Sequence, residues 1–139
     1  MTKFEKEILV SVEEFSKAID SLHISINLLN TSLSDQPNHL ELHKALRDSC
    51  IQRFEFSVEL CWKFLKRILE DKGVEVVYPR DVIRTAFAGR LINDEALWLS
   101  MLDDRNLTSH TYDEDLADEI FAHIPAYYQA MRDCLLSLS

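Results

Sequence analysis

The sequence predicts an all-α protein, a single antiparallel up-and-down helical bundle of about five helices, three of them long. First, the 139 residues include only two glycines and three prolines, so the chain has few of the residues that form tight turns. Second, apolar residues recur at steps of three or four over long stretches, as on one face of a helix. Third, the length suits one domain, residues 1–139, that buries its own core.

The first thirty residues carry one apolar stripe, which predicts the first long helix. The stripe consists of Phe4, Ile8, Val12, Phe15, Ile19, Leu22, Ile26 and Leu29. Residues 31–39 contain Ser, Asp and Pro and predict a loop. The second helix is expected from Leu40 to Lys72, with Gly73 just past its end. Because its middle is apolar on several faces, we expect it to be the hub of the bundle and a candidate face toward a dimer partner.

The second half of the chain predicts two shorter helices and a third long one. Residues 74–78 read as an extended connection, and Pro79 is well placed to open a short helix. Asn93 is the expected N-cap of the fourth helix, and Asp113 that of the fifth. Pro125 lies inside the apolar stripe of the fifth helix, so we expect it to kink or divide that helix.

Composition limits the classes of partner. A net charge of −9 and a pI of about 4.9 disfavour a surface for duplex nucleic acid and favour a basic partner protein or a small charged ligand held by arginines. Cys50, Cys61 and Cys134 form no C-x-x-C pair and are expected to be free core thiols, which fits a reducing cytoplasm. No apolar run is long enough to cross a membrane and no signal peptide is recognisable, so the expected location is cytoplasmic.

Metal and cofactor motifs are not apparent in the sequence. His39 and His43 would share a helix face, but the Glu that follows the first His in zinc proteases is absent and no third ligand is evident. Two glycines in the whole chain rule out a Gly-rich phosphate-binding loop. We therefore expect no metal and no cofactor.

The strongest candidate for a functional site is the polar stretch DDRNLTSHTY, residues 103–112. On a continuous helix Arg105 and His110 would point about 140° apart, whereas Asn106 and His110 would share a face. Either the helix breaks between Arg105 and His110, or a second copy of the chain completes the site. Polar residues such as Thr108 compete with helical hydrogen bonds, which keeps both alternatives open.

The residue types in this stretch suit metal-independent RNA cleavage. His110 could take the proton from a ribose 2′-hydroxyl, because His exchanges protons near neutral pH. Arg105 could stabilise charge on the phosphorus centre through its fork of donors. Asn106 could orient His110 or hold an oxygen, and Tyr112 offers a hydroxyl that could stack, hydrogen-bond or be modified.

The alternative to a catalytic site is a polar cap at the end of the fourth helix. In that case Asp103 and Asp104 would simply pair with the adjacent Arg105. Composition alone favours this alternative.

The motifs resemble those of the HEPN superfamily. The Arg-x4-His-x-Tyr pattern of Arg105, His110 and Tyr112 resembles that of HepT-type toxins, and the likeness is closer to the branch called nucleotidyltransferase substrate-binding proteins. That branch also has a central helix similar to residues 53–66, a short helix similar to residues 79–87 and a Trp ahead of the motif. The resemblance runs from the second helix to the start of the fifth.

This resemblance implies a bundle that forms a homodimer and pairs with a separately encoded small nucleotidyltransferase. In the toxin–antitoxin form such a protein is an RNase toxin, which the partner silences by transferring AMP to the motif Tyr, here Tyr112. Arg105 and His110 would then be the catalytic pair and Asn106 their support, while Arg105, His110 and Tyr112 would contact RNA or a nucleotide. Two alternatives stay open: a non-catalytic subunit that binds nucleotide or substrate and completes the partner's active site, and a dimeric scaffold.

Overall fold

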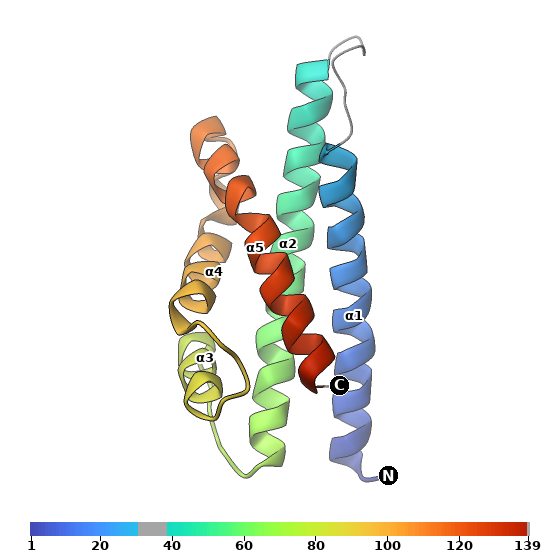
Figure 1. Cartoon of the computed structure of the whole chain (residues 1–139), viewed down its shortest axis with the longest axis vertical. Coiled ribbons are helices and arrows are strands. Elements are labelled where there is room, and N and C mark those ends of the chain that lie inside the picture. The colour runs from blue at the N-terminus through green and yellow to red at the C-terminus, as the bar shows by residue number, and fades with distance from the viewer. Residues whose placement is uncertain (31–38, 139) are drawn as a thin grey trace.

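The computed structural model describes residues 1–30 and 39–138, and the predicted all-α bundle is confirmed (Figure 1). The three long helices are α1 (Lys3–Leu29), α2 (His39–Asp71) and α5 (Glu114–Leu138). The two short helices are α3 (Pro79–Ala88) and α4 (Glu95–Leu107), and one 3-10 turn, η1 (Thr108–His110), follows α4. The expected second helix differs from α2 by one residue at each end. The loop predicted for residues 31–39 lies outside the described residues, except for His39, which opens α2.

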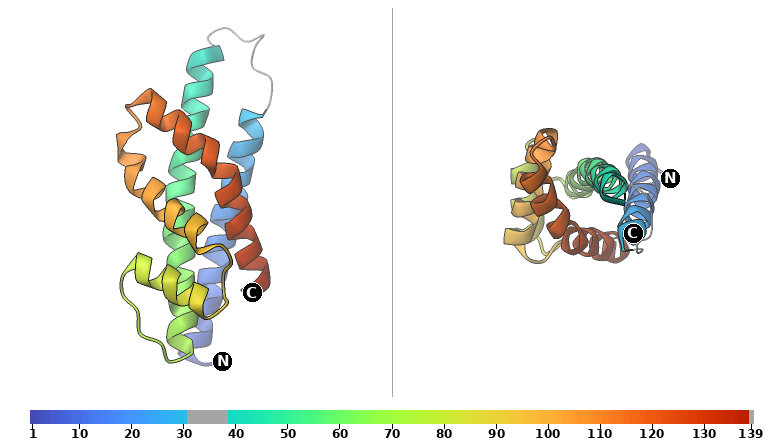
Figure 2. Two further views of the ribbon diagram at one scale, coloured as in Figure 1. Left: turned by 60° about the vertical axis from the view of Figure 1, so that its left-hand side comes forward. Right: turned by 90° about the horizontal axis from the view of Figure 1, so that it is seen from above.

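Helix α2 is the hub of the bundle, as the sequence predicts. It runs antiparallel to α1, and seen from above it lies between α1 and the pair α3 and α4, with α5 along a third side (Figure 2). It packs against every other described element. Phe54 and Phe64 of α2 are fully buried, and each contributes roughly 1.5–3 kcal/mol through burial. Within the described ranges no helix has both the length and the apolar composition needed to cross a membrane.

The end of α2 confirms the role predicted for Gly73. Gly73 has a φ of +83°, in the left-handed region that favours glycine. Its N–H donates to the carbonyl of Glu70, and the N–H of Val74 donates to the carbonyl of Leu69, both at 2.9 Å. This pair of bonds is a Schellman motif, which satisfies the last carbonyls of the helix. Residues 74–78 then form the expected extended connection to α3.

The sequence predicted the N-cap of α5 correctly and missed that of α4 by one residue. Asp113 caps α5 as expected, because its Oδ1 accepts a hydrogen bond from the N–H of Leu116 at 3.1 Å. The N-cap of α4 is Asp94, so the prediction of Asn93 was wrong by one residue. Asn and Asp cap helices about equally well, and the short side chain of Asp94 tolerates its φ of +56° while accepting from the N–H of Leu97.

Pro125 does not divide the fifth helix. Helix α5 is continuous from Glu114 to Leu138, with Pro125 inside it. Its axis changes direction along its length, as the orange-to-red ribbon in Figure 2 shows. A bend of this kind is the usual accommodation of a proline whose backbone donates no hydrogen bond.

A buried arginine fixes the start of α5 against α2. The side chain of Arg47 is only 2% exposed, and its Nη1 lies 2.8 Å from carboxylate oxygens of both Glu114 and Asp118. Asp48 adds a third ion pair at 3.0 Å. Burial alone would lower the pKa of Arg47, but the hydrogen bonds that it donates to the three carboxylates outweigh burial and raise the pKa. The anchor holds the chain just after η1, the turn that ends at His110.

The three cysteines are free and buried, as predicted. Burial raises the pKa of the Cys50 thiol and that of the Cys61 thiol. These thiols are therefore core groups in their uncharged form and are poor nucleophiles.

Candidate functional site

Helix α4 breaks between Arg105 and His110, which is one of the two arrangements the spacing required. The hydroxyl of Thr108 donates to the carbonyl of Arg105 at 2.8 Å, and Leu107 is the last α-helical residue. The chain continues as the 3-10 turn η1, which ends at His110. The Thr108 side chain thus donates to a backbone carbonyl near the end of α4. This is expected of a polar residue whose side chain competes with the backbone hydrogen bonds of a helix. Completion of the site by a second copy stays a prediction.

The guanidinium of Arg105 is held against α2. It forms an ion pair with Glu59, and its Nη1 donates to the side-chain oxygen of Asn106 at 3.5 Å. Its Nε atom is buried and has no hydrogen-bond partner. The Arg105 side chain therefore lies between α2 and α4, and its Nε–H has no acceptor.

The two aspartates that precede Arg105 do not pair with it, so that part of the polar-cap alternative was wrong. Asp103 pairs with Arg80 of α3 at 2.6 Å. Asp104 pairs with His123 of α5 at 2.8 Å. Successive side chains on a helix point about 100° apart, so these three neighbours face three different helices.

Asp104 belongs to a polar link between α4 and α5. Its Oδ2 also accepts a hydrogen bond from the Tyr127 hydroxyl at 2.7 Å. Burial raises the pKa of Tyr127, and the adjacent Asp104 raises it further. The Tyr127 ring stacks on Phe54 of α2, with ring centroids 5.5 Å apart. This link holds the last turns of α4 in place.

His110 and Tyr112 meet at the surface. The Nδ1 atom of His110 lies 3.3 Å from the Tyr112 hydroxyl, and the two rings meet edge to face with centroids 5.8 Å apart. Both side chains are exposed, Tyr112 to 81%. The structure therefore pairs Arg105 with Asn106, and His110 with Tyr112. In the part of the chain that the structure describes, no hydrogen bond joins the two pairs.

Arg105 and Asn106 also line a cleft of about 420 Å³ between α2, α3 and α4, which we call the arginine cleft. Its wall includes three arginines (Arg80, Arg84 and Arg105), two aromatic side chains (Trp62 and Tyr78) and two acids (Glu59 and Asp81). The arginines of the cleft outnumber its acids by one, in a chain whose net charge is −9. The sequence reasoning missed it, although its residues lie mostly in the segments 53–66 and 79–87 that carry the family resemblance.

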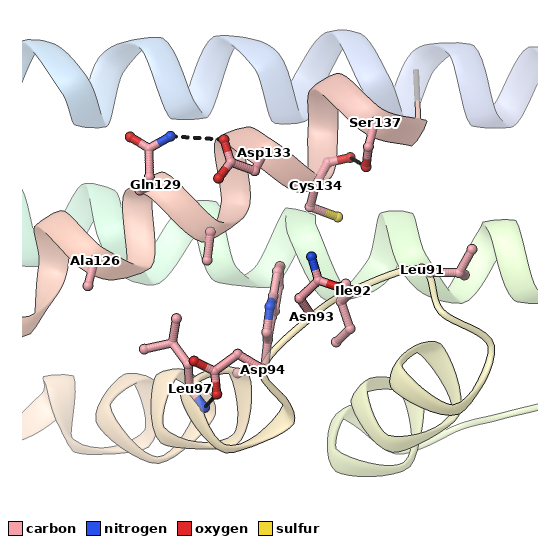
Figure 3. Close-up of a pocket in the computed structure, with 12 residues that line it drawn as sticks. Leu91, Ile92, Asn93, Asp94, Leu97, Ala126, Gln129, Asp133, Cys134 and Ser137 are labelled. Carbon is pink, nitrogen blue, oxygen red and sulfur yellow. Dashed lines mark hydrogen bonds between the residues drawn. The ribbon is translucent and has the colours of Figure 1, made fainter.

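A second cavity, of about 500 Å³, lies between the residues that open α4 and the C-terminal half of α5 (Figure 3). Its polar groups include Asn93, Asp94, Gln129 and Asp133, and no Arg, Lys or His lines it among the described residues. Asp133 accepts a hydrogen bond from Gln129 at 2.9 Å. Since its charged groups are acidic, this cavity is a poorer site for a phosphate than the arginine cleft.

The helical bundle, with an Arg-x4-His-x-Tyr segment where α4 breaks, is of the HEPN type. The chain belongs to the nucleotidyltransferase substrate-binding protein family, since the family described as "Nucleotidyltransferase substrate binding protein like" matches residues 11–139.

The chain is also similar to three known proteins. The chain is 39% identical over 79 residues to a Haemophilus influenzae protein named "Probable ribonuclease HepT", a match that spans 53% of this chain and 54% of that relative. It is similar to a solved H. influenzae structure described as having the fold of a substrate binding domain of a nucleotidyltransferase. That match has a TM-score of 0.76 and 29% identity over 89% of this chain and 96% of the other. A Thermus thermophilus structure matches with a TM-score of 0.68 and 38% identity, over 86% and 96% of the two chains.

Proposed function

We propose that this chain is the helical subunit of a two-protein module with a separately encoded small nucleotidyltransferase. In this module it is a metal-independent ribonuclease of the toxin type, and the partner silences it by AMP transfer to Tyr112. The observation that carries the proposal is the hydrogen-bond distance of 3.3 Å between His110 and Tyr112, at the end of the helix that presents Arg105. The name of the H. influenzae relative, a probable ribonuclease, supports the same activity.

The proposed cleavage uses the ribose of the RNA as its own nucleophile. Contact with Tyr112 occupies Nδ1 of His110, so Nε2 is the nitrogen that takes the 2′-hydroxyl proton. The 2′-oxygen then attacks the adjacent phosphorus, and the bond from phosphorus to the 5′-oxygen breaks. The 5′-oxygen leaves with a proton from water and a 2′,3′-cyclic phosphate forms. Arg105 stabilises the added negative charge on the phosphorane.

The proposed silencing uses the exposed hydroxyl of Tyr112. In the partner's active site this oxygen attacks the α-phosphorus of ATP, and pyrophosphate leaves. In the tautomer that carries its proton on Nε2, His110 accepts the hydroxyl proton at Nδ1. The resulting adenylyl group would lie against the His110 ring and exclude RNA from it.

A homodimer through the middle of α2 fits the proposal. Phe56 is 61% exposed in the middle of that helix, where a single-chain bundle would carry a polar residue. It lies three residues from Glu59, the partner of Arg105, and so shares a helix face with it. Pairing of two such faces would bring two copies of the motif toward each other. A second copy of the chain would then complete the site.

The test is cleavage of RNA by the purified chain in the presence of a metal chelator. Wild type should produce fragments with 2′,3′-cyclic phosphate ends, and His110→Ala should produce about 10²–10⁴-fold fewer, the usual contribution of a general base. Because His110 is exposed, the variant should keep the wild-type circular dichroism spectrum and melting temperature. Equal cleavage by both proteins would exclude His110 as the base.

One observation favours a second function, a non-catalytic subunit that binds nucleotide or substrate for the partner. Glu59 neutralises Arg105, so the arginine is not free to meet a phosphate until that ion pair opens. The solved relative described as a substrate binding domain fits this alternative. The binding-subunit alternative predicts that the chain alone cleaves no RNA and that Arg105→Ala lowers the activity of the partner.

A further inference from the structure

The arginine cleft contains groups that the proposed cleavage does not use. Tyr78 is 69% exposed at the start of α3, and Trp62 of α2 lines the same cleft. Arg84 is exposed on α3, and among the described residues it has no ion pair, unlike Arg80 and Arg105. The cleft therefore presents two aromatic side chains beside an arginine whose guanidinium is available.

Two donors in the cleft wall lack acceptors. The indole Nε1 of Trp62 and the Nε of Arg105 are buried and make no hydrogen bond. Buried donors without a partner are uncommon in folded proteins, so each calls for an acceptor from a ligand or water. The first turn of α3, which no side chain caps, also lines the cleft and includes the carboxylate of Asp81.

Aromatic faces, unpaired donors and a cation together suit one nucleotide. A nucleobase stacks on Tyr or Trp and accepts hydrogen bonds at its edge, and a phosphate pairs with Arg. A volume of about 420 Å³ is within the range of small-ligand sites. The base must be unpaired, because the edges and faces of a base in a duplex are covered by its neighbours.

We propose that the arginine cleft binds one unpaired nucleotide of single-stranded RNA, with the base against Tyr78 and Trp62 and the phosphate at Arg84. The inference deepens the proposed function and rests on it for the identity of the ligand as RNA. It places the nucleotide next to Arg105, one of the two residues that the proposed cleavage uses. It also accounts for RNA binding by an acidic chain, since a local site replaces a broad basic surface.

The test is a binding titration with a short single-stranded RNA oligonucleotide in the His110→Ala background, where the strand stays intact. Stacking should quench the fluorescence of Trp62, while Trp98 is buried outside the cleft and serves as an internal reference. Trp62→Phe, followed through a fluorescent label on the RNA, keeps an aromatic face and removes Nε1, which separates stacking from hydrogen bonding.

Two substitutions carry the test, each with a matched control. Tyr78→Ala should weaken binding about 5- to 100-fold, the usual effect of losing one stacked aromatic, and Phe87→Ala, an exposed aromatic of the same helix outside the cleft, should not. Arg84→Gln should reduce the slope of log affinity against log salt by about 0.7, the value for one phosphate contact on a single strand. Arg132→Gln, an exposed arginine of α5, should leave the slope unchanged.

The results distinguish this inference from the proposed function. Unchanged affinity in Tyr78→Ala and Arg84→Gln overturns the subsite, even if wild type cleaves RNA through His110. Binding of a duplex as tightly as the single strand overturns it as well, and so does equally tight binding of free AMP. Weaker binding by both variants, with no cleavage by wild type, keeps the subsite and removes the ribonuclease.

Discussion

The Nδ1 atom of His110 and the hydroxyl oxygen of Tyr112 lie 3.3 Å apart on an exposed turn between two helices. This distance couples the two proposed properties of the chain, since a group attached to Tyr112 would also block His110. The turn keeps its position through the Thr108 hydroxyl at its start and the Arg47 anchor just beyond its end.

Substitution of Tyr112 by Phe should abolish modification by the partner. The phenyl ring keeps the packing on His110 but has no oxygen to attack ATP. After incubation with the partner and ATP, mass spectrometry should find AMP on wild type and none on Tyr112→Phe. Tyr78→Phe, which removes another exposed hydroxyl, should be labelled like wild type. AMP found on Tyr112→Phe would show that the acceptor is a different residue.

Substitution of Glu59 by Gln should strengthen RNA binding. Glu59 neutralises Arg105 and repels phosphate, so its loss releases a cation into the arginine cleft. We expect roughly two- to fivefold tighter binding of a single strand, the scale of a partly exposed ion pair. Glu70→Gln, which removes the partner of Lys66 on the same helix, is the control and should have no effect. Weaker binding in Glu59→Gln would mean that the ion pair orients Arg105 for its ligand.

Substitution of Arg47 by Met should destabilise the fold far more than removal of a surface ion pair. Met preserves the apolar stem but leaves Glu114 and Asp118 without their cation. Since Glu114 and Asp118 are more than half exposed, the cost is that of lost hydrogen bonds between charged groups, on the order of 2 kcal/mol of unfolding free energy, measured by urea denaturation. Lys44→Met removes an exposed pair with Glu41 and should cost less than about 1 kcal/mol. Equal losses in the two variants would contradict the anchor.

Tyr127 should make the free energy of unfolding fall at alkaline pH. Its pKa is raised in the folded state by burial and by Asp104, whereas in the unfolded chain it is about 10. A raised folded-state pKa gives stability that is complete below the unfolded pKa and is lost as pH rises above it. The unfolding free energy of wild type should therefore fall more steeply above pH ~10 than that of Tyr127→Phe. Parallel curves for the two proteins would rule out this contribution.

The helices were predictable because their signals are local. The apolar stripe of α1, the Gly73 stop and the Asp113 cap each depend on a few neighbouring residues. The single missed cap, Asp94 instead of Asn93, reflects two adjacent residues that cap equally well. Pro125 was expected to kink or divide α5; the helix is not divided, and its axis bends along its length (Figure 2).

The contacts of the candidate site were predictable only in part. The sequence located Arg105, His110 and Tyr112 and allowed a break between the first two, which the structure contains. The partners of Asp103, Asp104 and Arg105 lie on α3, α5 and α2, and a pattern within ten residues carries no information on them. The arginine cleft was missed for the same reason, since it forms only when three helices pack.

Growth after induced expression of the chain without its partner is the most direct test of the ribonuclease assignment. Wild type should arrest growth, His110→Ala should not, and co-expression of the small nucleotidyltransferase should restore growth to cells that carry the wild-type protein. Normal growth with soluble wild-type protein, or arrest by both proteins, would contradict the account.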